Sequence, residues 1–198
     1  MSTQYANPAP LGLCGFGMTT ILLNIHNAGF FDISAVILAM GLCYGGLAQV
    51  LVGLMEFRRG NTFGTLAFTS YGLFWWSLVL IWVLPVLGLT EASPHSFVGW
   101  YLLLWGIFTL CLFFGTLKGA FIGKFVFGSL TTLFFLLAYK DFTGNASVGI
   151  FAGYVGIICG ASAIYEAIGL TLNEKYGREV IPMGEPKQAS VQVEAVLV

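Results

Sequence analysis

The residues from Asn7 to Pro10 are the most distinctive candidate for binding chemistry in the chain. Asn7 is a preferred helix-capping residue type, and a proline such as Pro8 suits the first position of a helix. An apolar run begins directly afterwards, at Leu11. The pattern predicts a helix N-terminus whose free N–H groups carry partial positive charge. Because such groups bind anions, we expect Asn7 and Pro8 to lie where an anion enters.

Neutral hydrogen-bonding side chains inside the apolar runs form a second candidate site. Hydroxyls and amides can hold a small polar solute loosely enough to release it, which a transport pathway requires. The alternative is that they only satisfy neighbouring backbone carbonyls, as hydroxyls in membrane helices commonly do. The candidate pathway residues of this kind are Thr19, Thr20, Asn24, Gln49, Thr69 and Tyr71.

Aromatic side chains are concentrated in two of the apolar runs. Phe16 lies midway along the first run, and Tyr71, Phe74 and Trp75 lie together in the third. Rings from several helices that meet at one depth can narrow a pore to an apolar neck, which is one way of gating. Ordinary helix packing would explain the same composition equally well. We add Trp75 to the candidate pathway residues.

The sequence contains no pattern typical of an enzyme or a metal site. The two histidines, His26 and His95, show no HExxH spacing, and there is no GxSxG motif. The four cysteines fall singly in four apolar runs without CxxC spacing, which is typical of small core residues. A net charge of −1 offers no basic surface for nucleic acid. We therefore predict a protein that is not an enzyme and binds no metal or cofactor.

Two carboxylates lie closest to membrane depth. Glu56 adjoins Arg58 and Arg59, so we expect an ion pair at the membrane interface. Glu166 lies about one turn from the end of the last apolar run. Pairing with a basic residue of a neighbouring loop is the favoured interpretation for Glu166, and a proton relay is the alternative.

The composition identifies the elements that must position these residues. Of 198 residues, 58% are apolar and 9% are charged, whereas soluble domains carry about 25% charged residues. A membrane-spanning helix needs about 20 mainly apolar residues. We predict an all-α integral membrane protein with six transmembrane helices and no soluble domain. The predicted spans are 9–26, 33–56, 65–87, 97–117, 119–139 and 147–170.

These spans leave little sequence for anything else. We expect a cytoplasmic N-terminal segment at 1–8, a transport domain at 9–172 and a partly disordered cytoplasmic tail at 173–198. The N-terminus lacks the basic region and small-residue cleavage site of a removable signal peptide. We therefore expect the first span to remain in the mature protein.

The basic residues predict how the helices are oriented. Seven of the eight Lys and Arg residues follow spans two, four and six, and Lys140 alone falls on the other side. Cytoplasmic loops carry an excess of Lys and Arg. We therefore expect both termini to be cytoplasmic and the protein to lie in the inner membrane.

Small-xxx-small glycine spacing occurs in spans two and six, for example at Gly41 and Gly45 and at Gly156 and Gly160. This spacing lets helix backbones approach closely in lipid. It has two interpretations, close packing within one chain or a contact between subunits, and the sequence leaves both open.

Several of these motifs together resemble the acetate uptake transporter family. The resemblance covers about residues 6–184. The residues that carry it are Asn7-Pro8-Ala9-Pro10-Leu11-Gly12-Leu13, Gly15-Phe16-Gly17-Met18-Thr19-Thr20, Phe68-Thr69-Ser70-Tyr71-Gly72 with Phe74-Trp75, and Gly160-Ala161-Ser162-Ala163 with Tyr165.

The resemblance implies a six-helix protomer that assembles as a hexamer in the lipid bilayer. It implies a pathway in each protomer for acetate and similar monocarboxylates, with succinate also accepted by some members. By motif position it implies a hydrophobic constriction at Phe16, Tyr71 and Leu130, and it adds Ala163 to the pathway residues. Family members are described both as proton symporters and as anion channels. The spans contain no central carboxylate, so we favour channel-like passage, with protons as an alternative co-substrate.

Two other functions stay open at this stage. A formate or nitrite channel is also a six-helix oligomeric anion pathway, and a histidine at the membrane midplane would favour it. A membrane sensor or scaffold that transports nothing would be favoured by a long ordered cytoplasmic tail, and the tail here is short.

Overall fold

The computed structural model describes residues 5–186, and all regular secondary structure in that range is helical. In the second span, the three successive segments α2, η1 and α3 form one continuous helix with wide π-helical turns at its centre. The segments are α1 (Ala9–Asn27), α2 (Ala35–Met40), η1 (Gly41–Ala48), α3 (Gln49–Arg58), α4 (Thr62–Val86), α5 (His95–Thr116), α6 (Phe121–Thr143) and α7 (Ala146–Tyr176).

Within the described range, six helices are long and apolar enough to cross a membrane, which confirms the six predicted spans. The largest difference in bounds concerns α7, which continues to Tyr176 although its span was predicted to end at residue 170. The helix therefore also runs past residue 172, where we had placed the end of the transport domain.

Local sequence explains where the helices begin and end. The side-chain oxygen of Asn61 accepts a hydrogen bond from Gly64 N at 3.0 Å at the start of α4, and Asn145 caps α7 in the same way. Gly144 and Gly177 follow α6 and α7 in the left-handed conformation, with φ of 69° and 63°. Only glycine adopts this conformation without a steric cost, so each helix ends there.

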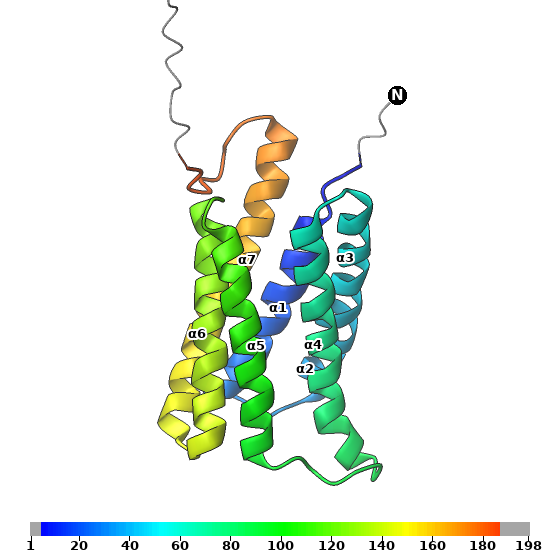
Figure 1. Cartoon of the computed structure of the whole chain (residues 1–198), viewed down its shortest axis with the longest axis vertical. Coiled ribbons are helices and arrows are strands. Elements are labelled where there is room, and N and C mark those ends of the chain that lie inside the picture. The colour runs from blue at the N-terminus through cyan, green and yellow to red at the C-terminus, as the bar shows by residue number, and fades with distance from the viewer. Residues whose placement is uncertain (1–4, 187–198) are drawn as a thin grey trace, which may run out of the picture.

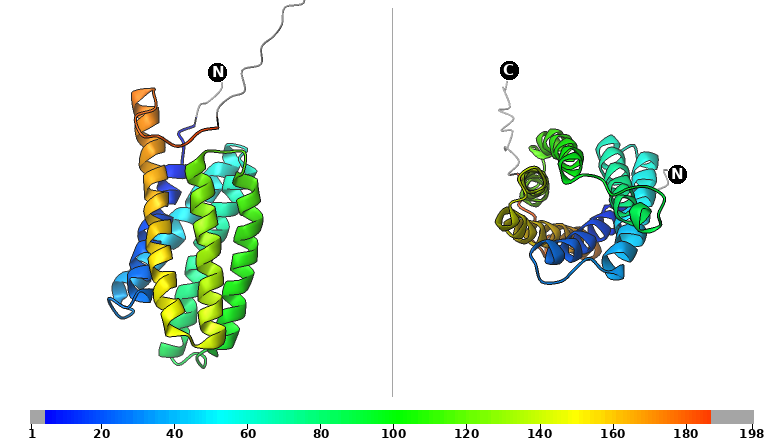
Figure 2. Two further views of the ribbon diagram at one scale, coloured as in Figure 1. Left: turned by 90° about the vertical axis from the view of Figure 1, so that its left-hand side faces the viewer. Right: turned by 90° about the horizontal axis from the view of Figure 1, so that it is seen from below.

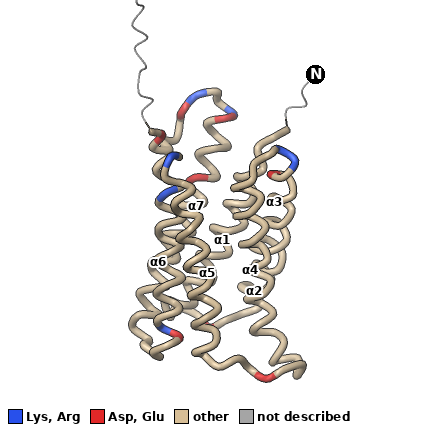
Figure 3. The backbone as a smooth tube through the Cα atoms, in the orientation of Figure 1, with Lys and Arg blue, Asp and Glu red and all other residues tan. Residues whose placement is uncertain are grey.

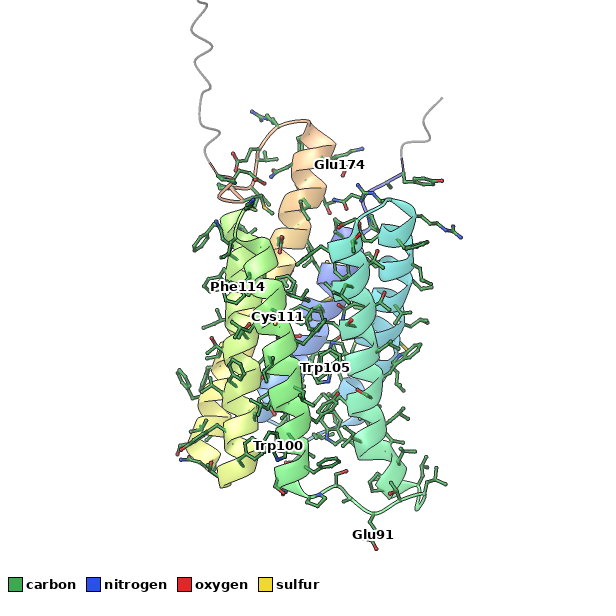
Figure 4. All side chains as sticks on the ribbon, viewed as in Figure 1. Glu91, Trp100, Trp105, Cys111, Phe114 and Glu174 are labelled. Atoms are coloured by element: carbon green, nitrogen blue, oxygen red, sulfur yellow. The ribbon has the colours of Figure 1, made fainter. Side chains whose placement is uncertain are left out.

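The helices stand side by side along the long axis of the molecule (Figure 1), and an end view shows them arranged around a ring (Figure 2). The most extensive helix pairings are α1 with α7 and α5 with α6. Between α4 and α5, aromatic side chains provide the contact: Phe74 stacks on Tyr101 with ring centroids 5.8 Å apart, and it also meets Trp105. Trp105 lies on the side of α5 that faces α4 (Figure 4).

The glycines bring helices together within the chain. A Cβ atom on Gly160 would lie 2.6 Å from the carbonyl oxygen of Gly17, so the backbones of α7 and α1 touch at this point. A Cβ atom on Gly45 would lie 2.9 Å from Thr19 Cγ2 and 2.9 Å from Trp75 Cγ. Of the two interpretations of the glycine spacing, the structure supports packing within the chain, because the space that a side chain would need is already occupied.

Charged residues gather at the two ends of the bundle (Figure 3). The ends of α3, α5 and α7 and the start of α6 lie at the same end as the N-terminus, which we call the proximal end. Six of the seven Lys and Arg residues in the described part of the chain lie there. The seventh, Lys140, lies near the end of α6 at the opposite, distal end.

The segment after α7 folds back onto the bundle. Its backbone accepts hydrogen bonds from the first turn of α6, at 2.8 Å from Phe121 N to Gly184 O. The side-chain oxygen of Asn173 accepts from Val180 N at 2.7 Å, and Tyr165 donates to Pro182 O. The start of the predicted tail is therefore packed. The last dozen residues, where we expected disorder, lie outside the described range.

Candidate functional site

Three cavities follow one another along the interior of the bundle. The proximal cavity has a volume of about 180 Å³ and lies among α1, α3, α4, α6 and α7. The middle cavity is small, at about 30 Å³. The distal cavity, of about 550 Å³, is bordered by α1, α4, α5 and α6. Together they connect the two ends of the bundle except where side chains close the space between them.

Phe16, Tyr71 and Leu130 line both the proximal and the middle cavity. They come from α1, α4 and α6, and all three are buried. The ring centroids of Phe16 and Tyr71 lie 6.1 Å apart. Three apolar side chains from three helices therefore separate the two cavities, and we call this group the neck.

The neck is held in place from α5. The hydroxyl of Tyr71 donates a hydrogen bond to Thr109 Oγ1 at 3.0 Å, and Thr109 in turn donates to Trp105 O at 2.7 Å. Both groups are buried, so the bond fixes the ring of Tyr71 between two helices whose backbones do not touch closely. The polar end of Tyr71 is thereby satisfied, and its ring contributes apolar surface to the neck.

Two residues that line the middle cavity, Thr20 and Trp75, each have a buried polar atom without a partner. Neither Thr20 Oγ1 nor Trp75 Nε1 makes a hydrogen bond within the described structure. Asn24 also borders this cavity, but its amide donates to Thr20 O at 2.8 Å. Unsatisfied buried donors are rare and unfavourable. The cavity has room for on the order of one or two water molecules, so a small polar group could satisfy them.

A chain of polar contacts organises the proximal end. Asn7 Oδ1 accepts from Ala9 N at 3.2 Å and from Arg59 Nη1 at 2.8 Å. Arg59 also lies 3.8 Å from Glu56 Oε1, which confirms the expected ion pair, and Asn61 donates to Glu56 Oε2 at 2.8 Å. Asn7 thus accepts a hydrogen bond from the first residue of α1, whose N-cap position is Pro8 and not Asn7 as we expected, and it holds the side chain of Arg59, which follows α3.

The first turn of α1 borders the proximal cavity through Ala9. Pro8 has helical dihedral angles, with φ −83° and ψ −13°, but it occupies the N-cap position, one residue before the first helical position that we predicted for it. Pro8 itself lines a separate surface hollow with Arg58 and Arg59. The N-terminus of α1 is therefore accompanied by two cations, a feature that the analysis of single motifs missed.

Glu166 is the one charged residue among those that line the proximal cavity. We expected it to pair with a basic residue of a neighbouring loop, and this was wrong for residues 5–186. None of the ion pairs within 4.0 Å in that range includes Glu166. The reason is geometric: Glu166 faces α6 at Gly123, where there is no side chain to meet it.

The distal cavity contains a small charged group. Lys140 Nζ lies 2.8 Å from Asp141 Oδ1, and His95 Nδ1 lies 3.8 Å from the same oxygen. His26 borders this cavity too and bonds Phe31 O at 2.7 Å. Within residues 5–186, no group of three or more His, Cys, Asp or Glu side chains is placed to hold a metal ion.

Three predicted pathway residues lie in helix contacts instead of on a cavity. Thr19 is fully buried against Gly45, Thr69 packs against Gly53, and Ala163 is fully buried. Gln49 does line the proximal cavity, although its amide donates to Gly45 O at 2.7 Å.

Sequence reasoning missed most of the cavity lining that α6 supplies. Apart from Lys140 and Asp141 at the distal cavity, the residues that face the cavities from this helix are apolar, and so are many that face outward, so composition gave no signal for the inner face. The overlooked lining residues of α6 are Val126, Phe127, Leu133, Phe134 and Leu137.

Comparison with known proteins now adds to this geometry. The sequence profile of the GPR1/FUN34/yaaH family matches residues 1–183. The chain is 61% identical over 184 residues to the succinate-acetate/proton symporter SatP of Escherichia coli K12, covering 93% of this chain and 98% of the relative. It is 32% identical to acetate permease A of Emericella nidulans, covering 91% of this chain and 66% of that one.

A solved structure supports the same conclusion. The structure of the bacterial acetate channel SatP superposes with a TM-score of 0.91 at 61% identity, covering 91% of this chain and all of the other. The resemblance inferred from the Asn7–Leu13 motif is confirmed, and the chain belongs to the GPR1/FUN34/yaaH family.

Proposed function

We propose that this protein transports acetate and related small carboxylates, succinate among them, across the membrane through a pathway inside each protomer. The observation that carries the proposal is the series of three cavities that meet at the neck of Phe16, Tyr71 and Leu130. The similarity to proteins named as a succinate-acetate/proton symporter, an acetate permease and an acetate channel supports the choice of solute.

The neck would select small solutes by two physical terms. Its apolar side chains leave little width, and a carboxylate that enters it loses water without gaining a charged partner, which is costly. Beyond the neck, Thr20 and Trp75 border the middle cavity, and a small rotation of their side chains would let the unpartnered hydroxyl and indole N–H donate to the carboxylate oxygens. Neutral donors bind an anion less firmly than a buried arginine would, so the solute can leave again.

The proposed orientation follows from charge. Six of the seven described Lys and Arg residues lie at the proximal end, and positive residues favour the cytoplasmic side. We therefore assign the proximal end, with both termini, to the cytoplasmic side of the inner membrane. Arg58, Arg59 and the start of α1 would then attract carboxylates at the cytoplasmic mouth.

The two alternatives gain no support from the geometry. A formate or nitrite channel would be favoured by a midplane histidine, but among residues 5–186 His26 lies near the end of α1 and His95 begins α5, both distal. A sensor or scaffold would need no cavities in series.

The function is tested by exchange of radiolabelled acetate into proteoliposomes, with protein-free vesicles as the control. We expect acetate exchange well above that of empty vesicles. A second set of vesicles, with an imposed pH gradient and a controlled membrane potential, distinguishes movement of charge from movement of protons. Acetate exchange equal to that of empty vesicles would refute the proposal.

Protomers should remain associated in mild detergent, and we propose a homo-oligomer, with a hexamer as the expected state. The family resemblance supports this, whereas the glycine spacing no longer does because those glycines pack inside the protomer. The measurement is native mass in several detergents. A mass equal to one subunit in all of them would contradict the proposal.

Replacement of Asn7 by alanine should reduce acetate exchange far more than it reduces the yield of folded protein. The N–H of Ala9 loses its acceptor at the start of α1, and the side chain of Arg59 loses its 2.8 Å partner at the mouth of the pathway. Asn7→Asp keeps both acceptor contacts and serves as the comparison for folding. Wild-type exchange by a well-folded Asn7→Ala protein would show that the motif does not orient the pathway entrance.

A further inference from the structure

Glu166 occupies an unusual place for a charged group. It lies on α7, and most of its surface is buried. It lines the proximal cavity, which lies on the proximal side of the neck. A Cβ atom on Gly123 of α6 would lie 3.3 Å from Glu166 Oε1, so the two helices are close at this level. A solute that leaves the neck towards the proximal end enters the cavity that this carboxyl group lines.

The surroundings do not neutralise Glu166. The other polar residues that line the cavity, Gln49 and Asn61, are uncharged. From the segment after α7, the carboxylate of Glu185 acts on Glu166 as a like charge. Lys124, on α6, forms no ion pair with it within 4.0 Å in the described structure.

The second carboxylate at this end provides a contrast. Glu56 has Arg59 at 3.8 Å and a hydrogen bond from Asn61 at 2.8 Å, and it does not line the cavity. Its charge is therefore balanced by fixed partners, whatever passes through the pathway. Glu166 has no such balance, so its charge acts directly on a passing anion.

We propose that Glu166 is a protonatable gate, which must hold a proton whenever a carboxylate occupies the proximal cavity. This inference rests on the proposed transport of carboxylates. Two negative charges repel strongly at short range where water is scarce. A proton on the carboxyl oxygen of Glu166 removes one of them, and that proton is released again to the water at the proximal mouth after the anion has left.

The gate has two consequences. Transport of a monocarboxylate decreases as pH rises, because the ionised form of Glu166 repels it. A dicarboxylate carries up to two charges and is repelled more, so Glu166 also favours acetate over succinate. Such a pathway is open like a channel, yet it requires a proton in the cavity. It is therefore compatible with both names given to the relatives, proton symporter and channel.

The test compares Glu166→Gln with Glu174→Gln in proteoliposomes. Glutamine keeps the size and polarity of Glu166 but removes the ionisable group. Glu174 is an exposed residue on the same helix, on the part that extends beyond the other helices (Figure 4), and it does not line the cavity. Acetate and succinate exchange are measured at equal pH on both sides, from about pH 5 to about pH 8, a range above the ordinary carboxyl pKa of about 4, so exposed carboxyl groups such as that of Glu174 stay ionised throughout.

For Glu166→Gln we expect acetate exchange that no longer decreases with rising pH, and succinate exchange at the high end that increases by about tenfold or more relative to acetate. Glu174→Gln should follow the wild type, and Glu166→Asp should restore the pH dependence. A merely structural role would lower both exchange rates together without changing their ratio.

The proposal is overturned if Glu166→Gln, shown to be monodisperse, keeps the wild-type pH profile and the wild-type ratio of succinate to acetate. It is also overturned if wild-type exchange is independent of pH, although carboxylate transport itself would then stand. Absence of acetate exchange in the wild type would instead refute the transport function on which the gate rests.

Discussion

Replacement of Leu130 by alanine should allow larger carboxylates to pass and raise butyrate exchange relative to acetate by roughly tenfold or more. Leu130 lines the cavities on both sides of the neck, and its side chain is 4% exposed. Removing three carbons widens the neck and leaves space for part of the hydration shell of the solute. If a charged site selected the solute, exchange would depend on the number of charges on the carboxylate, and the change from leucine to alanine would leave the size preference unaltered.

The measurement is competition among acetate, butyrate and succinate in exchange assays. Leu133→Ala is the matched control, because Leu133 lies on the same helix, is 3% exposed and lines only the middle cavity of the three. Both variants should lose similar stability, about 2–5 kcal/mol for a buried leucine. An unchanged size preference in folded Leu130→Ala protein would mean that the neck lies elsewhere.

Replacement of Gly160 by alanine should destabilise the bundle severely, lowering the thermal midpoint by about 5 °C or more. The new Cβ would lie 2.6 Å from the carbonyl oxygen of Gly17 and 2.7 Å from Ile21 Cγ1. A backbone atom cannot move aside as a side chain can, so α1 and α7 must separate. Since α1 also carries Phe16, the neck should be disturbed as well.

Gly128→Ala in α6 provides the control for this prediction. Its Cβ would meet only the ring of Phe113, at 3.4 Å, which is close to an ordinary contact. Alanine is also the better helix former by about 1 kcal/mol, so this variant should be as stable as the wild type or more stable. The measurement is thermal unfolding monitored by size-exclusion chromatography. Equal midpoints for the two variants would contradict the close contact between α1 and α7.

Helix number and the start of α1 could be predicted because both depend on local chemistry. A helix crosses the membrane when about 20 apolar residues follow one another, and the loops are short enough to leave no doubt about the count. The hydrogen bond from Ala9 N to Asn7 joins residues two positions apart and is present, although Pro8 occupies the N-cap position that we predicted for Asn7. The partner that Asn7 finds in Arg59, 52 positions later, could not be foreseen in this way.

Only two of the three neck residues could be identified as candidates from the residue types themselves. Phe16 and Tyr71 were candidates because aromatic rings are suited to closing a pore, whereas Leu130 entered only through the family resemblance. The sequence does not reveal which way a leucine in an apolar helix faces, because leucine is equally favourable towards lipid and in the protein interior. The neck as a functional unit stays a prediction until Leu130→Ala is measured.

The sequence by itself determined that the chain is a six-helix membrane protein and to which family it belongs, because hydropathy and contiguous motifs can be recognised without knowing which helices touch. Only the tertiary structure decided which polar groups are free to act. Thr19 and Thr20 are neighbours of one residue type, yet Thr19 packs against Gly45 and Thr20 keeps an unpartnered hydroxyl at the middle cavity. Glu56 finds Arg59 three residues away, as the sequence predicted, whereas Glu166 depends on other elements for a partner and has no ion pair within residues 5–186. Partners on other elements are set by packing, which the order of residues along the chain does not reveal.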